Sequence, residues 1–80
     1  SKLEGKLNLP VETTIPVAEF ISGFTTNTQP LPKTYNYSAN ESIYDSLGIQ
    51  HRLTFYFVKQ LAERTWRIYV GLDGVDVTPT

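Results

Sequence analysis

Asp45, Ser46 and His51 are the residue types from which a hydrolase builds its orienting carboxylate, its nucleophile and its general base. Such catalysis requires the serine and the histidine within hydrogen-bond reach, together with donors for an oxyanion. The aspartate and the serine instead belong to the run Asp-Ser-Leu-Gly, whose composition is typical of a turn. The sequence has no glycine-flanked serine elbow. We therefore expect no catalytic residue and no enzyme, with His51 as the first residue after a bulge rather than a base.

Metal and cofactor chemistry has equally little support in the composition. The chain has one histidine and no cysteine, so it contains no zinc-ligand spacing. The nearest approach to a calcium loop is Asp73-Gly74-Val75-Asp76, which lacks the further oxygen ligands and the terminal glutamate of an EF-hand. A turn explains these four residues better. We expect no metal, no cofactor and no small-molecule substrate.

Five tyrosines, four phenylalanines and one tryptophan supply a second candidate surface. Such rings can form a platform that stacks on sugars, which keeps a carbohydrate-binding or adhesin-type module as an alternative. Phe55, Phe57 and Trp66 fall on strand faces that we expect to be buried, where large aromatic residues dominate core energetics. Removing Trp66 from a core would cost about 3–5 kcal/mol. For the tyrosines, burial and contact with another protein both stay open, and they are Tyr35, Tyr37, Tyr44, Tyr56 and Tyr69.

The strands that position these residues are expected within residues 41–73. Leu53, Phe55 and Phe57 alternate with Thr, Tyr and Val, and residues 66–72 alternate in the same way. A period of two places successive side chains on opposite faces of a strand. These residue types also fit a pleated surface well. We predict an all-β fold, a small antiparallel meander that curls into a barrel or a sandwich.

Three turn sequences separate the expected strands. Asp45-Ser46-Leu47-Gly48 combines an aspartate that accepts hydrogen bonds from the following backbone with a glycine that tolerates positive φ, which predicts a type I turn with a glycine bulge. Residues 59–64 are polar, lack glycine and proline, and suit a hairpin loop. Asp73-Gly74 marks a further reversal. Because a slip of one residue would turn every side chain to the other face, these turns help set the register.

The first half of the chain is expected to be less regular. Residues 2–9 alternate apolar and polar side chains and indicate an edge strand. Phe20 and Phe24 stand four positions apart in a stretch too short for an independent helix. We expect an irregular segment there, whose rings cover the open face of the sheet. The whole chain, residues 1–80, is thus interpreted as a single β domain, with the edge strand and the irregular segment in residues 1–40 and the strand meander in residues 41–80.

Length and charge restrict the possible classes of protein. Eighty residues form one domain or part of one, and a chain this short buries only about 60% of its unfolded surface. The net charge is −1 with both signs interspersed, so the basic patch of a nucleic-acid binder is missing. No run reaches the roughly 18 apolar residues of a transmembrane helix, and no secretory signal is present. The sequence contains no methionine, which indicates a fragment of a longer protein.

The run IYDSLGIQHRLTFYFVK, followed by TWRIYV, has a distinctive order of residues. A Tyr-Asp-Ser turn with a glycine precedes a histidine, a stretch ending in Tyr-Phe-Val-Lys, and a tryptophan that opens another strand. This order resembles the middle region of the bacterial flagellar hook protein family. Residues 34–38 and 6–9 also resemble the family, whereas residues 11–32 match little and Ile49 stands where the family often has a small polar residue. The matching residues are Tyr44, Asp45, Ser46, Gly48, His51, Tyr56, Phe57, Val58, Lys59 and Trp66.

The resemblance implies a structural function. Hook subunits polymerise into a short curved tube that transmits torque from motor to filament, and the middle domain makes contacts between subunits. The implied partners are other copies of the same protein, with no nucleic acid and no membrane insertion. The implied location is extracellular, in the flagellar hook, after export without a cleavable signal peptide. The family's middle region continues further, which implies an incomplete domain with an edge near residues 75–80 left unpaired. A related rod or hook-associated subunit stays open as a further alternative.

Overall fold

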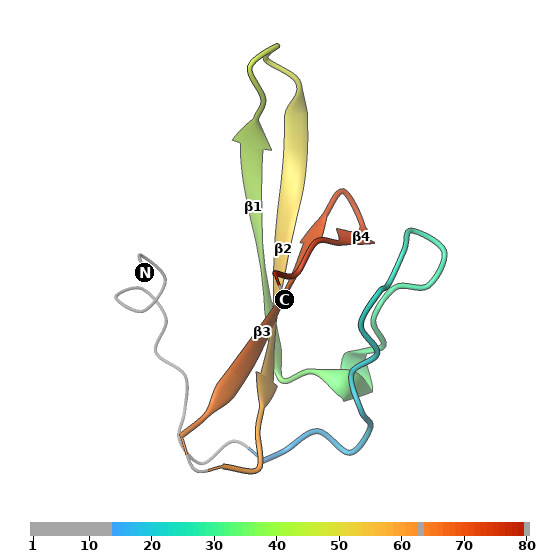
Figure 1. Ribbon diagram of the computed structural model, residues 1–80, viewed down its shortest axis with the longest axis vertical. Helices are drawn as coiled ribbons and strands as arrows, with labels where there is room; N and C mark the ends of the chain where they lie inside the picture. The colour runs from blue at the N-terminus through green and yellow to red at the C-terminus, as the bar shows by residue number, and fades with distance from the viewer. Residues whose placement is uncertain (1–13, 63, 80) are drawn as a thin grey trace.

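The computed structural model describes residues 14–62 and 64–79, and its strands form one antiparallel sheet (Figure 1). In the described part of the chain, four strands follow a single turn of 3₁₀ helix, and each pairs with its neighbour in the sequence. The predicted all-β meander is confirmed. Within the described ranges the sheet is open rather than closed into a barrel, and the strand expected over residues 2–9 lies outside them. The elements are η1 (Pro32–Thr34), β1 (Tyr37–Tyr44), β2 (Gln50–Lys59), β3 (Trp66–Leu72) and β4 (Val75–Asp76).

The turn between β1 and β2 has the predicted chemistry. The Gly48 amide donates to the Asp45 carbonyl at 2.9 Å, and Gly48 has a φ of 82°. The Asp45 carboxylate accepts from the amides of Leu47 and Ile49, each at 2.9 Å. A residue other than glycine would be strained at this positive φ. The first strand, however, begins at Tyr37, four residues before the expected position, since the pairing with β2 extends to the Tyr37↔Phe57 pair.

The other two connections differ in tightness. Between β2 and β3, the Gln60 amide donates to the Thr65 carbonyl at 2.9 Å, and the loop turns at Arg64, whose φ is 60°. Between β3 and β4, Asp73 and Gly74 both have positive φ, 51° and 89°. This is the geometry of a type I′ turn, whose twist matches that of the flanking strands. Asp-Gly therefore acts as a hairpin turn, as its sequence predicts.

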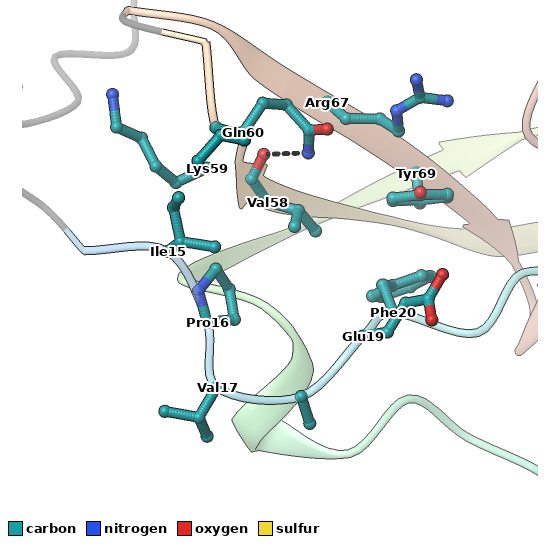
Figure 2. A pocket seen from close by; sticks show the side chains of 12 residues that line it. Ile15, Pro16, Val17, Glu19, Phe20, Val58, Lys59, Gln60, Arg67 and Tyr69 are labelled. Carbon is teal, nitrogen blue, oxygen red and sulfur yellow. Dashed lines mark hydrogen bonds between the residues drawn. The ribbon is translucent and has the colours of Figure 1, made fainter.

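The main core lies on the face of the sheet that carries the tyrosines of β2 and β3. Phe20 and Phe24, from the irregular segment before η1, pack against Tyr56 and Val58. Phe20 stacks on Tyr69 with ring centroids 4.0 Å apart and an interplanar angle of 17° (Figure 2). Phe24 is 3% exposed and meets the Tyr56 ring edge-on. Aromatic pairs in such geometries add to the stability gained from burial alone. The expectation that these two phenylalanines cover a sheet face is confirmed.

Hydrogen bonds from the strands hold this irregular segment against the sheet. The Asp76 amide donates to the Phe24 carbonyl at 2.9 Å, and the Gly23 amide donates to the Asp76 carboxylate at 2.5 Å. The Gln29 side chain donates to the Gly74 carbonyl at 2.8 Å. Near the start of β1, the Asn36 side chain donates to the Thr14 carbonyl at 2.7 Å. These bonds satisfy backbone groups that no strand pairs, so an irregular chain can cover the core.

The opposite face of the sheet carries Phe55, Phe57, Ile68, Val70 and Trp66, by the period of two and the pairings Phe55↔Val70 and Phe57↔Ile68. The expectation that this face holds the main core was wrong for two of its three aromatic residues. Phe57 is buried, but Phe55 and Trp66 are only half-buried. The Lys59 ammonium stands 5.6 Å from the centre of the Trp66 ring. The expected burial of Phe55 and Trp66 was wrong because alternation assigns residues to a face of the sheet but does not determine which face the irregular segment covers.

Candidate functional site

A histidine joins the two turns at one end of the sheet. His51, near the start of β2, places Nδ1 2.5 Å from Oδ2 of Asp73 and Nε2 2.9 Å from Oδ2 of Asp45. Asp45 belongs to the β1–β2 turn, and Asp73 to the β3–β4 turn. The Asp73 carboxylate also accepts from the Arg52 amide at 3.0 Å. We call these three side chains, Asp45, His51 and Asp73, the histidine bridge.

Two carboxylates facing one imidazole favour its charged form. The hydrogen bond to Asp73, and next the one to Asp45, raise the pKa of His51 above its ordinary value. The hydrogen bond from His51 in turn lowers the pKa of Asp45 and the pKa of Asp73. As an imidazolium, His51 has a donor on each ring nitrogen and can bond to both carboxylates at once. The side chains are 29%, 35% and 49% exposed for His51, Asp45 and Asp73, so water weakens these attractions.

The histidine bridge gives Asp45 and His51, two of the three residues considered above for hydrolysis, a structural role. The structure brings Asp45 and His51 together but uses both imidazole nitrogens on carboxylates, which leaves none for Ser46. Asp45 also keeps its predicted role in the turn. Sequence reasoning placed His51 after a bulge and did not predict its pairing with Asp73, 22 residues away. No local motif signals that pairing, because only the β2–β3 register brings the two side chains together.

The short Asp73–Asp76 stretch sends its two carboxylates in different directions. Asp73 bonds to His51 and Arg52, whereas Asp76 bonds to the Gly23 amide and to Thr78. A turn whose carboxylates diverge does not form a cation cage. Over residues 14–62 and 64–79, no group of three or more His, Cys, Asp or Glu side chains is arranged to hold a metal ion.

The histidine bridge should depend on pH in two directions. Because the pKa of His51 is raised, its contribution to stability is complete below the ordinary value of 6.5 and is lost as the pH rises through the raised value. Because the pKa of Asp45 and of Asp73 is lowered from 3.8, their contribution is present above 3.8 and is lost as the pH falls through the lowered values. The bridge is therefore complete between roughly pH 4 and 6.5.

An NMR titration of this chain measures the upper limit of that window. We expect the His51 ring signals to titrate with a midpoint above 6.5, and the amide signals of Leu47 and Ile49 to move with the same midpoint. The His51→Gln variant keeps a polar side chain but has no proton to lose, so its amide signals should stay constant over this range. A midpoint at or below 6.5, or amide signals of Leu47 and Ile49 that do not follow the His51 titration, would contradict the bridge.

The end of the β1–β2 hairpin, residues 44–49, presents apolar side chains to solvent. We call these residues the hairpin tip. Leu47 is 81% exposed and Ile49 is 53% exposed, and Tyr44 is exposed beside them. The pairing between β2 and β3 stops at Leu53, so the hairpin projects beyond the other strands (Figure 1). Apolar side chains gathered at a projecting point are typical of a contact surface rather than of a core.

The tyrosines do not form a common platform for sugars. Tyr56 is buried under Phe20 and Phe24, and Tyr69 is stacked on Phe20. Tyr37 lies near Trp66 on the opposite face, with ring centroids 6.0 Å apart. Tyr44 alone stands at the hairpin tip. The rings that were to stack on a ligand are therefore divided between the core and two separate surfaces.

A hollow of about 550 Å³ lies where the irregular segment meets the ends of β2 and β3 (Figure 2). Its lining includes Glu19, Lys59 and Arg67. In Figure 2 the charged ends of Lys59 and Arg67 extend to opposite sides, and between them lie the apolar side chains of Ile15 and Val58. The lining contains neither histidine nor cysteine, and its ionisable side chains are Glu19, Lys59, Arg67 and Tyr69.

Fold and site together define a small all-β module whose histidine bridge joins two of its turns and whose hairpin tip is one of the places where apolar side chains are exposed. Residues 8–80 match the family described as the flagellar basal body protein FlaE D2 domain. Because the match spans nearly the whole chain, the chain belongs to this family and is a region of a flagellar hook structural subunit.

Membership of this family confirms the resemblance noted in the sequence. It places the protein in the bacterial flagellum and in a family whose members self-assemble into a polymer. Searches of curated proteins and of solved structures found no match. Among the described residues no helix is long and apolar enough to cross a membrane.

Proposed function

We propose that this domain makes subunit–subunit contacts in the curved hook tube, which transmits torque from the motor to the filament, and that it is not an enzyme. In this proposal it works outside the cell, after export without a cleavable signal peptide. The observation that carries the proposal is the hairpin tip, where Leu47 and Ile49 are exposed on a projecting, braced hairpin. Burying a side chain of this size against a partner contributes about 1.5–3 kcal/mol, so two of them dominate a small contact.

The test replaces Leu47 and Ile49 by serine in the hook protein that carries this domain. Both side chains are exposed, so the domain should fold with an unchanged melting temperature. We expect complete hooks to fall about tenfold or more by electron microscopy, together with loss of swimming, because each lost contact of about 1.4 kcal/mol lowers the affinity about tenfold and two contacts are lost. The matched control replaces Val17 and Leu61, which are exposed elsewhere on the domain, and should leave hooks normal.

Normal hook number and swimming in the tip variant would contradict the proposal. Immunogold labelling with an antibody to this domain separates the remaining alternatives. Label on the short curved segment between envelope and filament is the expected result. Label on the rod would favour the rod alternative, and label spread over the cell surface would favour an adhesin-type module.

A further inference from the structure

The hairpin tip is pre-ordered and carries no free charge. Its one ionisable carboxylate, Asp45, uses Oδ1 for the Leu47 and Ile49 amides and Oδ2 for His51. The backbone between these residues is closed by the bond from the Gly48 amide to the Asp45 carbonyl. A tip held in this way loses little conformational freedom on binding. Its most exposed large side chains are Leu47, Tyr44 and Ile49, so it suits a receiving surface that is at least partly apolar.

One of the described hollows has a lining of apolar and uncharged polar side chains. It has a volume of about 540 Å³ and is formed by the irregular segment around η1, with walls that include Ile21, Phe24, Pro30 and Leu31. We call it the loop hollow. Its lining has no ionisable side chain, whereas the four other described hollows each include at least one. At its edge Ile21 is 71% exposed and Leu31 is 55% exposed.

The tip and the loop hollow belong to different parts of the domain. The tip is the far end of the β1–β2 hairpin, and the loop hollow lies in the segment that runs beside the sheet and includes η1 (Figure 1). A contact between two different patches is heterologous, and it extends into an open polymer when the rotation between copies does not close a ring. Two like patches would instead close a dimer. The family to which the chain belongs forms a polymer, which requires contacts of the open kind.

We propose that the hairpin tip of one copy docks in the loop hollow of the next copy, with Leu47 and Ile49 placed against Ile21, Pro30 and Leu31. The occupant is a second copy of this chain, and in this respect the inference rests on the proposed function. The histidine bridge sets the angle at which the tip leaves the sheet, so it also sets the approach to the neighbouring copy.

Engineered cysteines test this contact directly, because the chain has no cysteine of its own. Leu47→Cys and Leu31→Cys are introduced together in the hook protein, and assembled hooks are oxidised mildly. A head-to-tail contact joins each copy to the next, so a non-reducing gel should show a ladder of covalent multimers. Each single variant should lack the ladder. The matched control pairs Leu47→Cys with Leu61→Cys, an equally apolar and even more exposed position on the β2–β3 loop, and should give none.

A second pair of variants keeps the proposal testable if the cysteine variants assemble poorly. Ile21→Ser with Leu31→Ser removes the edge of the loop hollow while leaving Phe24 in the core. We expect the same loss as for the tip variant, a fall in complete hooks of about tenfold or more. Normal hooks from this variant, or a ladder that also forms with Leu61→Cys, would overturn the docking site. If the Leu47 and Ile49 variant blocks assembly but the Ile21 and Leu31 variant does not, the proposed function stands and only the loop hollow as the docking site is wrong.

Discussion

Replacement of Phe24 by alanine is expected to remove about 3–5 kcal/mol from the free energy of unfolding. The ring is 3% exposed and packs against Phe20 and Tyr56, so alanine would leave a cavity at the centre of the main core. The backbone around it is fixed by the bonds from Gly23 and Asp76, which limits how far the site can collapse. A domain of this size has little stability in reserve, so the variant should be largely unfolded at 37 °C.

Urea denaturation followed by tryptophan fluorescence measures this loss. The control, Val17→Ala, removes an exposed aliphatic side chain from the same irregular segment and should change the free energy of unfolding by less than about 0.5 kcal/mol. If Phe24→Ala kept the midpoint of the unmodified chain, the segment before η1 would not be part of the cooperative fold. The tyrosine face would then have no cover, and the description of the core would be wrong.

Replacement of Gly71 by valine is expected to destabilise the domain by about 1–3 kcal/mol. A Cβ at this position would stand 3.0 Å and 3.2 Å from two ring atoms of Phe24. The sign of the change in the free energy of unfolding distinguishes two cases. Valine is favoured over glycine in an open strand position, so it would stabilise β3 if the space were free. The glycine is therefore needed for the close approach of the Phe24 ring to the sheet.

A double-mutant cycle with Phe24→Leu isolates that contact. Leucine lacks the two outer ring atoms that the valine would meet, so the cost of Gly71→Val should fall by about 1–2 kcal/mol in this background. Thermal and urea unfolding of the four proteins give the coupling. Additive effects would mean that the valine is accommodated elsewhere, and the contact between Gly71 and Phe24 would have no energetic consequence.

The sequence pattern of Trp66 predicted a buried side chain, but the structure leaves it half-buried. The alternation in residues 66–72 put Trp66 on a strand face expected to be buried, and the β2–β3 register places it on the face of Phe55 and Phe57. A core position would have made Trp66→Ala as damaging as Phe24→Ala. The structure places it half-buried at the start of β3, beside the Lys59 ammonium. We therefore expect a smaller loss for Trp66→Ala than for Phe24→Ala. A period of two determines which residues of a strand share a face. Whether that face is buried depends on the irregular segment, which is distant in the sequence.

The candidate site was predictable only in part, for a similar reason. The turn chemistry of Asp45 and Gly48 is local, and both behave as the sequence predicts. The pairing of His51 with Asp73 depends on the register of β2 against β3, which no short motif encodes. The exposure of Leu47 and Ile49 likewise depends on how far β1 and β2 extend past the end of β3.

The sequence by itself determined the all-β meander, its three turns and the family, because alternation and turn chemistry are local and the motif from Tyr44 to Trp66 is distinctive. Only the tertiary structure decided which face Phe20 and Phe24 cover, which carboxylates His51 joins, and that the tip lies free of the other strands. The physical reason is that these features depend on contacts between residues far apart in the chain. Such contacts are chosen by packing and by hydrogen-bond satisfaction over the whole fold, and not by the preferences of neighbouring residues.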